Sequence, residues 1–63
     1  MIDGRKIRIL RENAGLSTVA FAEKVTTSQS MVVQIEKGYK SPGSLLLKRI
    51  ADFFGMKVDE FYV

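Results

Sequence analysis

The sequence predicts an all-α fold, a compact bundle of five short helices in one domain that spans residues 1–63. Apolar residues recur at spacings of three and four, as on one face of an amphipathic helix. Glycine follows three of these stretches, at Gly15, Gly38 and Gly55, where a helix can end in a left-handed residue. No stretch alternates as a strand does. A chain this short buries only about 60% of its unfolded surface, so the core must be built from local elements.

The first helix is expected from about Arg5 to Asn13, with Asp3 as its N-cap. Its inward face carries four side chains at helical spacing: Ile7, Leu10, Arg11 and Ala14. Arg11 is unusual on that face, because a buried charge needs a partner.

The second and third helices are expected over residues 18–25 and 29–37, with Ser17 and Ser28 as their N-caps. Only residues 26–28 join them, and so short a link forces the sharp corner of a helix-turn-helix. The motif requires four apolar positions and one small one, and all five agree: Phe21, Ala22, Val25, Val32 and Ile35.

A fourth helix is expected over residues 45–54, with Ser44 as its N-cap. The connector before it, residues 38–43, contains a Pro-Gly pair that cannot continue the third helix. A final helical turn over residues 58–62 closes the core with Val58 and Phe61.

The composition argues against an enzyme, a metal site and a bound cofactor. The chain has neither cysteine nor histidine, so the commonest general base and the commonest metal ligands are missing. The longest apolar run, residues 19–22, is far too short to span a membrane, and the N-terminal residues lack a signal-peptide apolar region. We therefore expect a cytoplasmic protein, and its net charge of +3 permits binding to a polyanion.

Eight groups of residues carry a family resemblance that needs no gap: Ile7 with Leu10-Arg11, Gly15-Leu16-Ser17, Phe21-Ala22-Glu23-Lys24-Val25, Ser28-Gln29-Ser30, Ile35-Glu36-Lys37-Gly38, Ser41-Pro42, Ile50-Ala51 with Phe54-Gly55, and Val58-Asp59-Glu60-Phe61. With them, nearly the whole chain resembles the phage repressor and Cro-like (Xre-type) helix-turn-helix DNA-binding family. The resemblance implies a lambda repressor-like fold and a sequence-specific transcriptional regulator of double-stranded DNA. It also implies a small dimeric repressor that reads an inverted-repeat operator, is bacterial or phage-encoded, and associates with the nucleoid.

The resemblance makes the third helix the recognition helix, which enters the major groove. Its family base-reading positions are matched by Gln29, Ser30, Val33 and Gln34, whose chemistry suits adenine and thymine. The other interpretation is a solvated helix face. Six residues at helix starts or near the recognition helix are candidates for contacts with the DNA backbone: Ser17, Thr18, Ser28, Lys37, Tyr39 and Lys40. Lys40 can equally be a solubilising charge.

In this family an arginine of the first helix pairs with a glutamate of the recognition helix, and here these are Arg11 and Glu36. The resemblance therefore implies a buried salt bridge that fixes the recognition helix, and Arg11 can reach phosphate as well. Three other basic residues, Arg5, Lys6 and Arg8, are expected to form a solvated face that assists by electrostatic steering.

Three residues depart from the family pattern. Thr18 replaces a glutamine that anchors the second helix on phosphate, so that contact is shortened, lost or taken over by the hydroxyl. Thr26 replaces a corner glycine, so either strain is tolerated or the corner differs locally. Ser44 replaces a common leucine, which suggests a shifted start for the fourth helix.

Surplus apolar residues near the C-terminus predict a homodimer, because exposed patches on small domains mark interfaces. The dimer residues are expected to be Leu46, Phe53, Phe61, Tyr62 and Val63. Alternatively, these side chains cap the core of a monomer. A second function also remains open, namely an antitoxin or another protein-interaction module that uses the same fold to bind an unknown protein partner.

Overall fold

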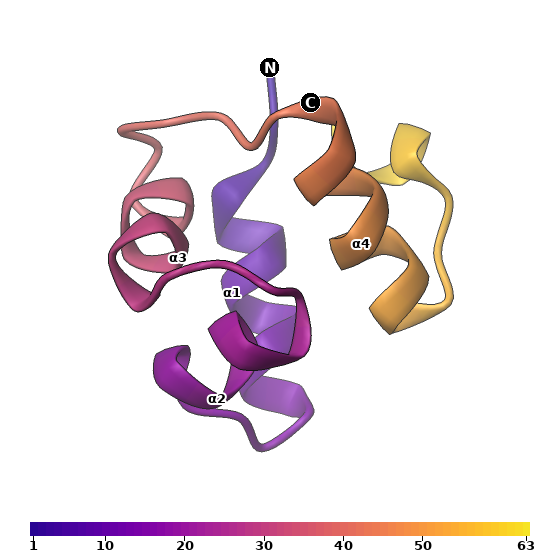
Figure 1. Ribbon diagram of the computed structural model, residues 1–63. Helices are drawn as coiled ribbons and strands as arrows, with labels where there is room; N and C mark the ends of the chain where they lie inside the picture. The colour runs from indigo at the N-terminus through magenta and orange to yellow at the C-terminus, as the bar shows by residue number, and fades with distance from the viewer.

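The computed structural model describes all 63 residues and is all-α, as predicted (Figure 1). Its helices are α1 (Gly4–Asn13), α2 (Thr18–Lys24), α3 (Gln29–Glu36) and α4 (Ser44–Phe54). The predicted fifth helix is a single 3-10 turn, η1 (Val58–Phe61), so the fold has four α-helices rather than five. None of these helices is both long enough and apolar enough to cross a membrane.

Three of the four predicted N-caps are confirmed. Asp3, Ser17 and Ser28 each accept a hydrogen bond, 3.1 Å long, from the backbone amide three residues further along the chain. The fourth prediction was wrong: Ser44 is the first residue of α4, and Gly43 is its N-cap without a side-chain hydrogen bond. The helix begins one residue earlier because extended glycine backbone can take the cap position without a side-chain acceptor.

The core lies where the four helices and η1 meet, and α1 packs against α3 and η1 (Figure 1). Eleven apolar side chains form it: Ile7, Phe21, Ala22, Val25, Val32, Ile35, Leu46, Leu47, Ile50, Ala51 and Phe61. Ala14, which was expected on the inward face of the first helix, is exposed because α1 ends at Asn13 and Ala14 is its C-cap.

Both ends of the chain lie side by side and fasten η1 to α1 (Figure 1). The Asp3 amide donates to the Phe61 carbonyl at 2.7 Å, and the Val63 amide donates to the Met1 carbonyl at 2.9 Å. Lys6 Nζ donates to the Glu60 carbonyl at 2.7 Å. The two backbone hydrogen bonds form an isolated antiparallel bridge between Ile2 and Tyr62. The apolar pattern did not predict this bridge, because it rests on backbone groups.

The corner between α2 and α3 is held by an arginine from α4. Thr26 has a φ of +59°, so it adopts the left-handed conformation that glycine has in the family pattern. Arg49 Nε donates to the Val25 carbonyl at 2.9 Å, and Arg49 Nη2 donates to the Thr26 carbonyl at 3.2 Å. The corner therefore keeps its geometry despite the β-branched residue, and the strain is tolerated.

Replacing Thr26 with glycine is expected to stabilise the protein. A left-handed conformation costs an L-residue about 1–2 kcal/mol, whereas the extra entropy of unfolded glycine costs about 0.5–1 kcal/mol. The net gain is up to about 1.5 kcal/mol, which corresponds to a melting temperature higher by several degrees, at about 4–8 °C per kcal/mol. Thr27→Gly is the matched control, because Thr27 has no positive φ, and it should lower the melting temperature. A decrease for Thr26→Gly would contradict the strain argument.

Candidate nucleic-acid interface

Helix α3 is amphipathic, and its polar side faces outward. Val32 and Ile35 are each 2% exposed and anchor α3 in the core. Gln29 and Ser30 are exposed, and Gln34 is partly exposed, so neither glutamine lies beneath another part of the chain. The predicted base-reading side chains are thus accessible to a ligand that approaches α3 from outside.

Two hydrogen bonds hold the outward glutamine side chains in place. Gln29 Nε2 donates to the Thr18 hydroxyl at 3.0 Å, which joins the start of α3 to the start of α2. Gln34 Nε2 donates to the Ser30 hydroxyl at 2.9 Å, one turn earlier on α3. Each amide keeps its oxygen and one N–H free, which is the acceptor and donor pair that matches an adenine edge. The sequence pattern did not reveal the bond between Thr18 and Gln29.

The residues expected to contact the DNA backbone lie around α3, at helix starts and in the connector. The Ser17 and Ser28 hydroxyls accept from backbone amides as N-caps, so each can still donate its own O–H to a phosphate. Lys37, Tyr39 and Lys40 follow α3 and are all exposed. Neither lysine takes part in an ion pair.

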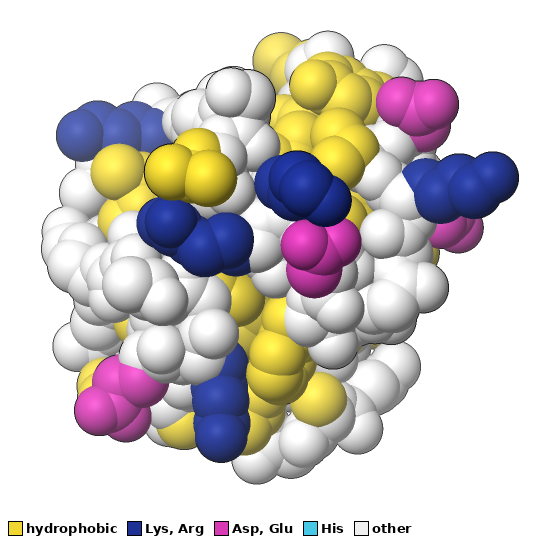
Figure 2. Space-filling model, turned by 45° about the vertical axis from the view of Figure 1, so that its right-hand side comes forward, with side chains coloured by type: hydrophobic (Ala, Val, Ile, Leu, Met, Phe, Trp, Pro, Cys, Tyr) yellow, Lys and Arg dark blue, Asp and Glu magenta, His cyan; other side chains and the backbone are white.

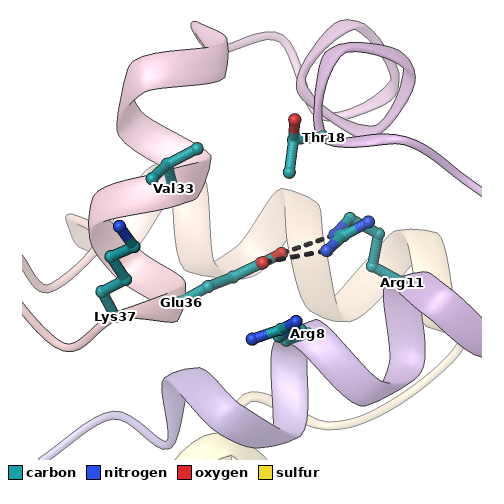
Figure 3. Close-up of a pocket in the computed structure, with 6 residues that line it drawn as sticks. All are labelled: Arg8, Arg11, Thr18, Val33, Glu36 and Lys37. Atoms are coloured by element: carbon teal, nitrogen blue, oxygen red, sulfur yellow. Dashed lines mark hydrogen bonds and ion pairs between the residues drawn. The ribbon is translucent and has the colours of Figure 1, made fainter.

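A nearly buried ion pair joins α1 to the end of α3 (Figure 3). Arg11 Nε lies 2.7 Å from Glu36 Oε2, and Arg11 Nη2 donates to Glu36 Oε1 at 3.1 Å. Arg11 Nη1 also donates to the Leu16 carbonyl at 2.8 Å, in the loop before α2. Hydrogen bonding to Glu36 raises the pKa of Arg11 above its ordinary value, although burial acts in the opposite direction. One guanidinium therefore connects three parts of the fold.

A hollow of about 230 Å³ lies beside this ion pair, between α1, α2 and α3 (Figure 3). Six residues line it: Arg8, Arg11, Thr18, Val33, Glu36 and Lys37. Most of the lining is charged, and the volume is below the roughly 300–1,000 Å³ of typical small-molecule sites. The chain also has no group of three acidic side chains that could hold a metal ion.

The predicted dimer residues divide into two sets. Leu46 and Phe61 are 9% and 0% exposed, so they belong to the core and their assignment to an exposed interface was wrong. They are buried because both side chains pack into the hydrophobic core. Phe53, Tyr62 and Val63 remain on the surface. Leu45, which was not predicted, is 67% exposed.

The face that includes α4 shows hydrophobic side chains at the surface, with charged side chains between them (Figure 2). Phe53 is only partly available there, because its ring lies 5.1 Å from the Phe54 ring and 5.9 Å from the Phe21 ring, centroid to centroid. The apolar surface on this side is therefore smaller than the sequence suggested, and it is divided by charge.

Comparisons with known proteins connect this geometry to a family. A helix-turn-helix family profile matches residues 7–61. An uncharacterized HTH-type transcriptional regulator, MJ0272 of Methanocaldococcus jannaschii, is 31% identical over 58 residues, which are 92% of this chain and 88% of that protein. A second one, YazB of Bacillus subtilis, is 32% identical over 57 residues, which are 90% of this chain and 83% of that protein.

The fold is also similar to a solved structure, that of the restriction-modification controller protein C.AhdI from Aeromonas hydrophila. The TM-score is 0.83 at 24% identity, and the match covers 94% of this chain and 89% of C.AhdI. Because the two relatives come from an archaeon and a bacterium, they do not favour the expected bacterial or phage source over an archaeal one. The chain belongs to the Xre/Cro-type helix-turn-helix family of DNA-binding transcriptional regulators, which is not a family of enzymes.

Proposed function

We propose that this chain is a sequence-specific regulator that inserts α3 into the major groove of double-stranded DNA. One observation carries the proposal: Gln29 and Gln34 present their amides on the outward side of a helix whose other side is buried, and each is held by a hydroxyl group. Preorganised polar groups suit recognition, because little side-chain entropy remains to be lost on binding. As a DNA-binding regulator, the chain would act in the cytoplasm at the nucleoid.

The outward side chains favour A·T base pairs. A glutamine amide can pair with adenine N7 and N6 in a bidentate manner, and a valine side chain can contact a thymine methyl group. Gln29 and Gln34 supply the amides, and Val33 lies between them on the same side of α3. Ser30 can donate or accept, but its oxygen already accepts from Gln34.

Contacts with the DNA backbone supply affinity rather than sequence preference. We assign them to the six residues expected above: Ser17, Thr18, Ser28, Lys37, Tyr39 and Lys40. Those at the starts of α2 and α3 lie beside backbone N–H groups that favour an anion. Lys37 and Lys40 add two positive charges that are not paired with a carboxylate.

A symmetric homodimer completes the proposal. In a dimer, two recognition helices about 34 Å apart match successive major grooves and read an inverted repeat. Leu45, Phe53, Tyr62 and Val63 are the exposed apolar residues that support such an interface near the C-terminus. Such a dimer represses by occupying its operator. If these residues bind a different protein instead, as in an antitoxin, the chain will purify with a stoichiometric partner and shift no DNA.

Two alanine variants separate base reading from backbone contact. Gln34→Ala is expected to weaken binding to the preferred site by about 1–3 kcal/mol and to relax the choice at one base pair. Lys40→Ala is expected to weaken binding to all sequences alike, because phosphate carries no sequence information. Dissociation constants for the preferred duplex and for single-base variants, at one stated salt concentration, provide the measurement. An equal loss on every sequence for both variants would contradict base reading by Gln34.

A further inference from the structure

The hollow beside α3 carries an excess of positive charge. Three of its six lining residues are cations, and only Glu36 is an anion. Arg11 and Glu36 neutralise each other through their bidentate pair. The charges left over come from Arg8 on α1 and Lys37 at the C-cap of α3.

Neither remaining cation is held by a strong partner. Lys37 takes part in no ion pair. Arg8 Nε lies 3.4 Å from Glu12 Oε2, and both side chains are more than half exposed. Exposed pairs of this kind contribute little to stability and exchange readily for another anion. The hollow can therefore offer Arg8 and Lys37 to a ligand of opposite charge.

The hollow adjoins the outward side of α3. Val33 and Lys37 lie one turn apart on α3 and form one wall, and Thr18 at the start of α2 forms another (Figure 3). A helix seated in the major groove has a phosphate backbone along each of its sides, because the groove is only about 12 Å wide. The connector residues Tyr39 and Lys40 follow the C-terminal end of α3, whereas the hollow lies along its flank toward α1 and α2.

We infer that this hollow binds one phosphate of the DNA backbone, and that Arg8 of α1 and Lys37 at the end of α3 hold it. The inference rests on the proposed function and adds Arg8 to the residues that touch DNA. It also changes the role of Arg8, because the sequence suggested a solvated face that only steers. Arg8 follows Arg5 by one turn, but only Arg8 lines the hollow, and Lys6 is engaged by the Glu60 carbonyl.

The salt dependence of DNA binding tests this contact. Each phosphate contact contributes about 0.9 to the slope of log affinity against log salt concentration. Arg8→Ala is therefore expected to reduce that slope by about 0.9, so that its loss of affinity is about threefold larger at 50 mM than at 150 mM salt. Because Arg8 is exposed and outside the core, the circular dichroism melting curve of the Arg8→Ala variant should match that of the parent.

Lys48→Ala is the matched control. Lys48 also carries one positive charge in an exposed pair four residues from its partner, with Nζ 3.3 Å from Asp52 Oδ2, but it lies on α4 away from the hollow. Its loss should leave the salt slope unchanged. The inference would be overturned if the Arg8→Ala variant and the parent had equal salt slopes. It would also be overturned if Arg8→Ala and Lys48→Ala reduced the salt slope equally. If the parent binds no duplex at all, the proposed function fails and the inference fails with it.

A second measurement identifies the source of the phosphate. Single phosphates in the duplex are replaced, one position at a time, with neutral methylphosphonates. At one position per half-site, the replacement should weaken DNA binding by the parent but not by the Arg8→Ala variant, since the variant has already lost the contact with that phosphate. If no position behaves in this way, and millimolar inorganic phosphate shifts the Arg8 guanidinium NMR signal in the DNA complex, the hollow takes a free anion and the inference is wrong.

Discussion

Replacing Glu36 with alanine is expected to lower the free energy of unfolding by about 3–5 kcal/mol. The Arg11 side chain is only 10% exposed, so the substitution leaves a nearly buried guanidinium without its counter-charge and without two of its three hydrogen bonds. A domain of this size has a total stability of only about 3–9 kcal/mol at typical values per residue. The variant should therefore be largely unfolded at room temperature, or close to it.

Urea denaturation at neutral pH, followed by circular dichroism, measures this loss. Glu12→Ala is the control, because Glu12 is also a helical glutamate paired with an arginine, yet its pair is exposed and should contribute less than about 1 kcal/mol. The loss of unfolding free energy for Glu36→Gln should lie between those for Glu12→Ala and Glu36→Ala, since an amide oxygen can still accept one hydrogen bond from Arg11. A Glu36→Ala melting temperature within error of the parent would refute a structural role for the pair.

Gly4→Ala is expected to have the second largest effect on stability. Gly4 is buried at the start of α1, where an added Cβ would collide with the Ile35 carbonyl oxygen at the end of α3. Backbone atoms cannot move aside as a flexible side chain can, so the two helices must separate. We expect a loss of about 1–3 kcal/mol, the usual cost of overpacking. Helix propensity alone predicts the opposite sign, a gain of up to about 1 kcal/mol.

Gly43→Ala is the matched control for this substitution. Gly43 also has a negative φ and adjoins the start of a helix, but a Cβ there meets nothing within 4 Å. Its effect should therefore be limited to the roughly 0.5–1 kcal/mol by which glycine is a better N-cap than alanine. Equal midpoints of urea denaturation for the two variants would contradict the close contact between α1 and α3.

The features that sequence predicts well are local. The caps at Asp3, Ser17 and Ser28 are correct because a cap depends on residues three positions apart. Helix α3 and its buried Val32 and Ile35 follow from apolar spacing alone. The left-handed glycine residues after the helices also follow from local backbone preference.

The features that the sequence does not predict are contacts between residues that are far apart along the chain. The residues around Gly4 form no pattern that indicates the nearby Ile35 carbonyl. Arg49 donates to carbonyl groups more than twenty residues earlier in the chain. Leu46 had the same apolar character as Val63, and only the packing of α4 into the core separates the buried residue from the exposed one. Phe61 was expected both in the core and at the interface, and its burial assigns it to the core. The ion pair of Arg11 with Glu36 is also long-range, and it was expected only because the family resemblance implied it.

The candidate site shows the same division. Gln29, Ser30 and Gln34 could be placed on the outward side of α3 by helical periodicity. The support that Thr18 gives to Gln29 could not, because α2 and α3 meet at an angle that depends on the corner at Thr26. Arg8 likewise joins the hollow only through the position of α1 beside α3.

The central claim is that the outward side of α3 reads bases in the major groove of DNA. Selection of bound duplexes from a random pool, with purified chain at a stated salt concentration, tests it most directly. We expect an enriched inverted repeat with half-site centres about 10–10.5 base pairs apart. When the selection is repeated with Gln34→Ala, preference should be lost at one position per half-site. A pool without any enriched sequence, or the same enriched sequence for both proteins, would contradict it.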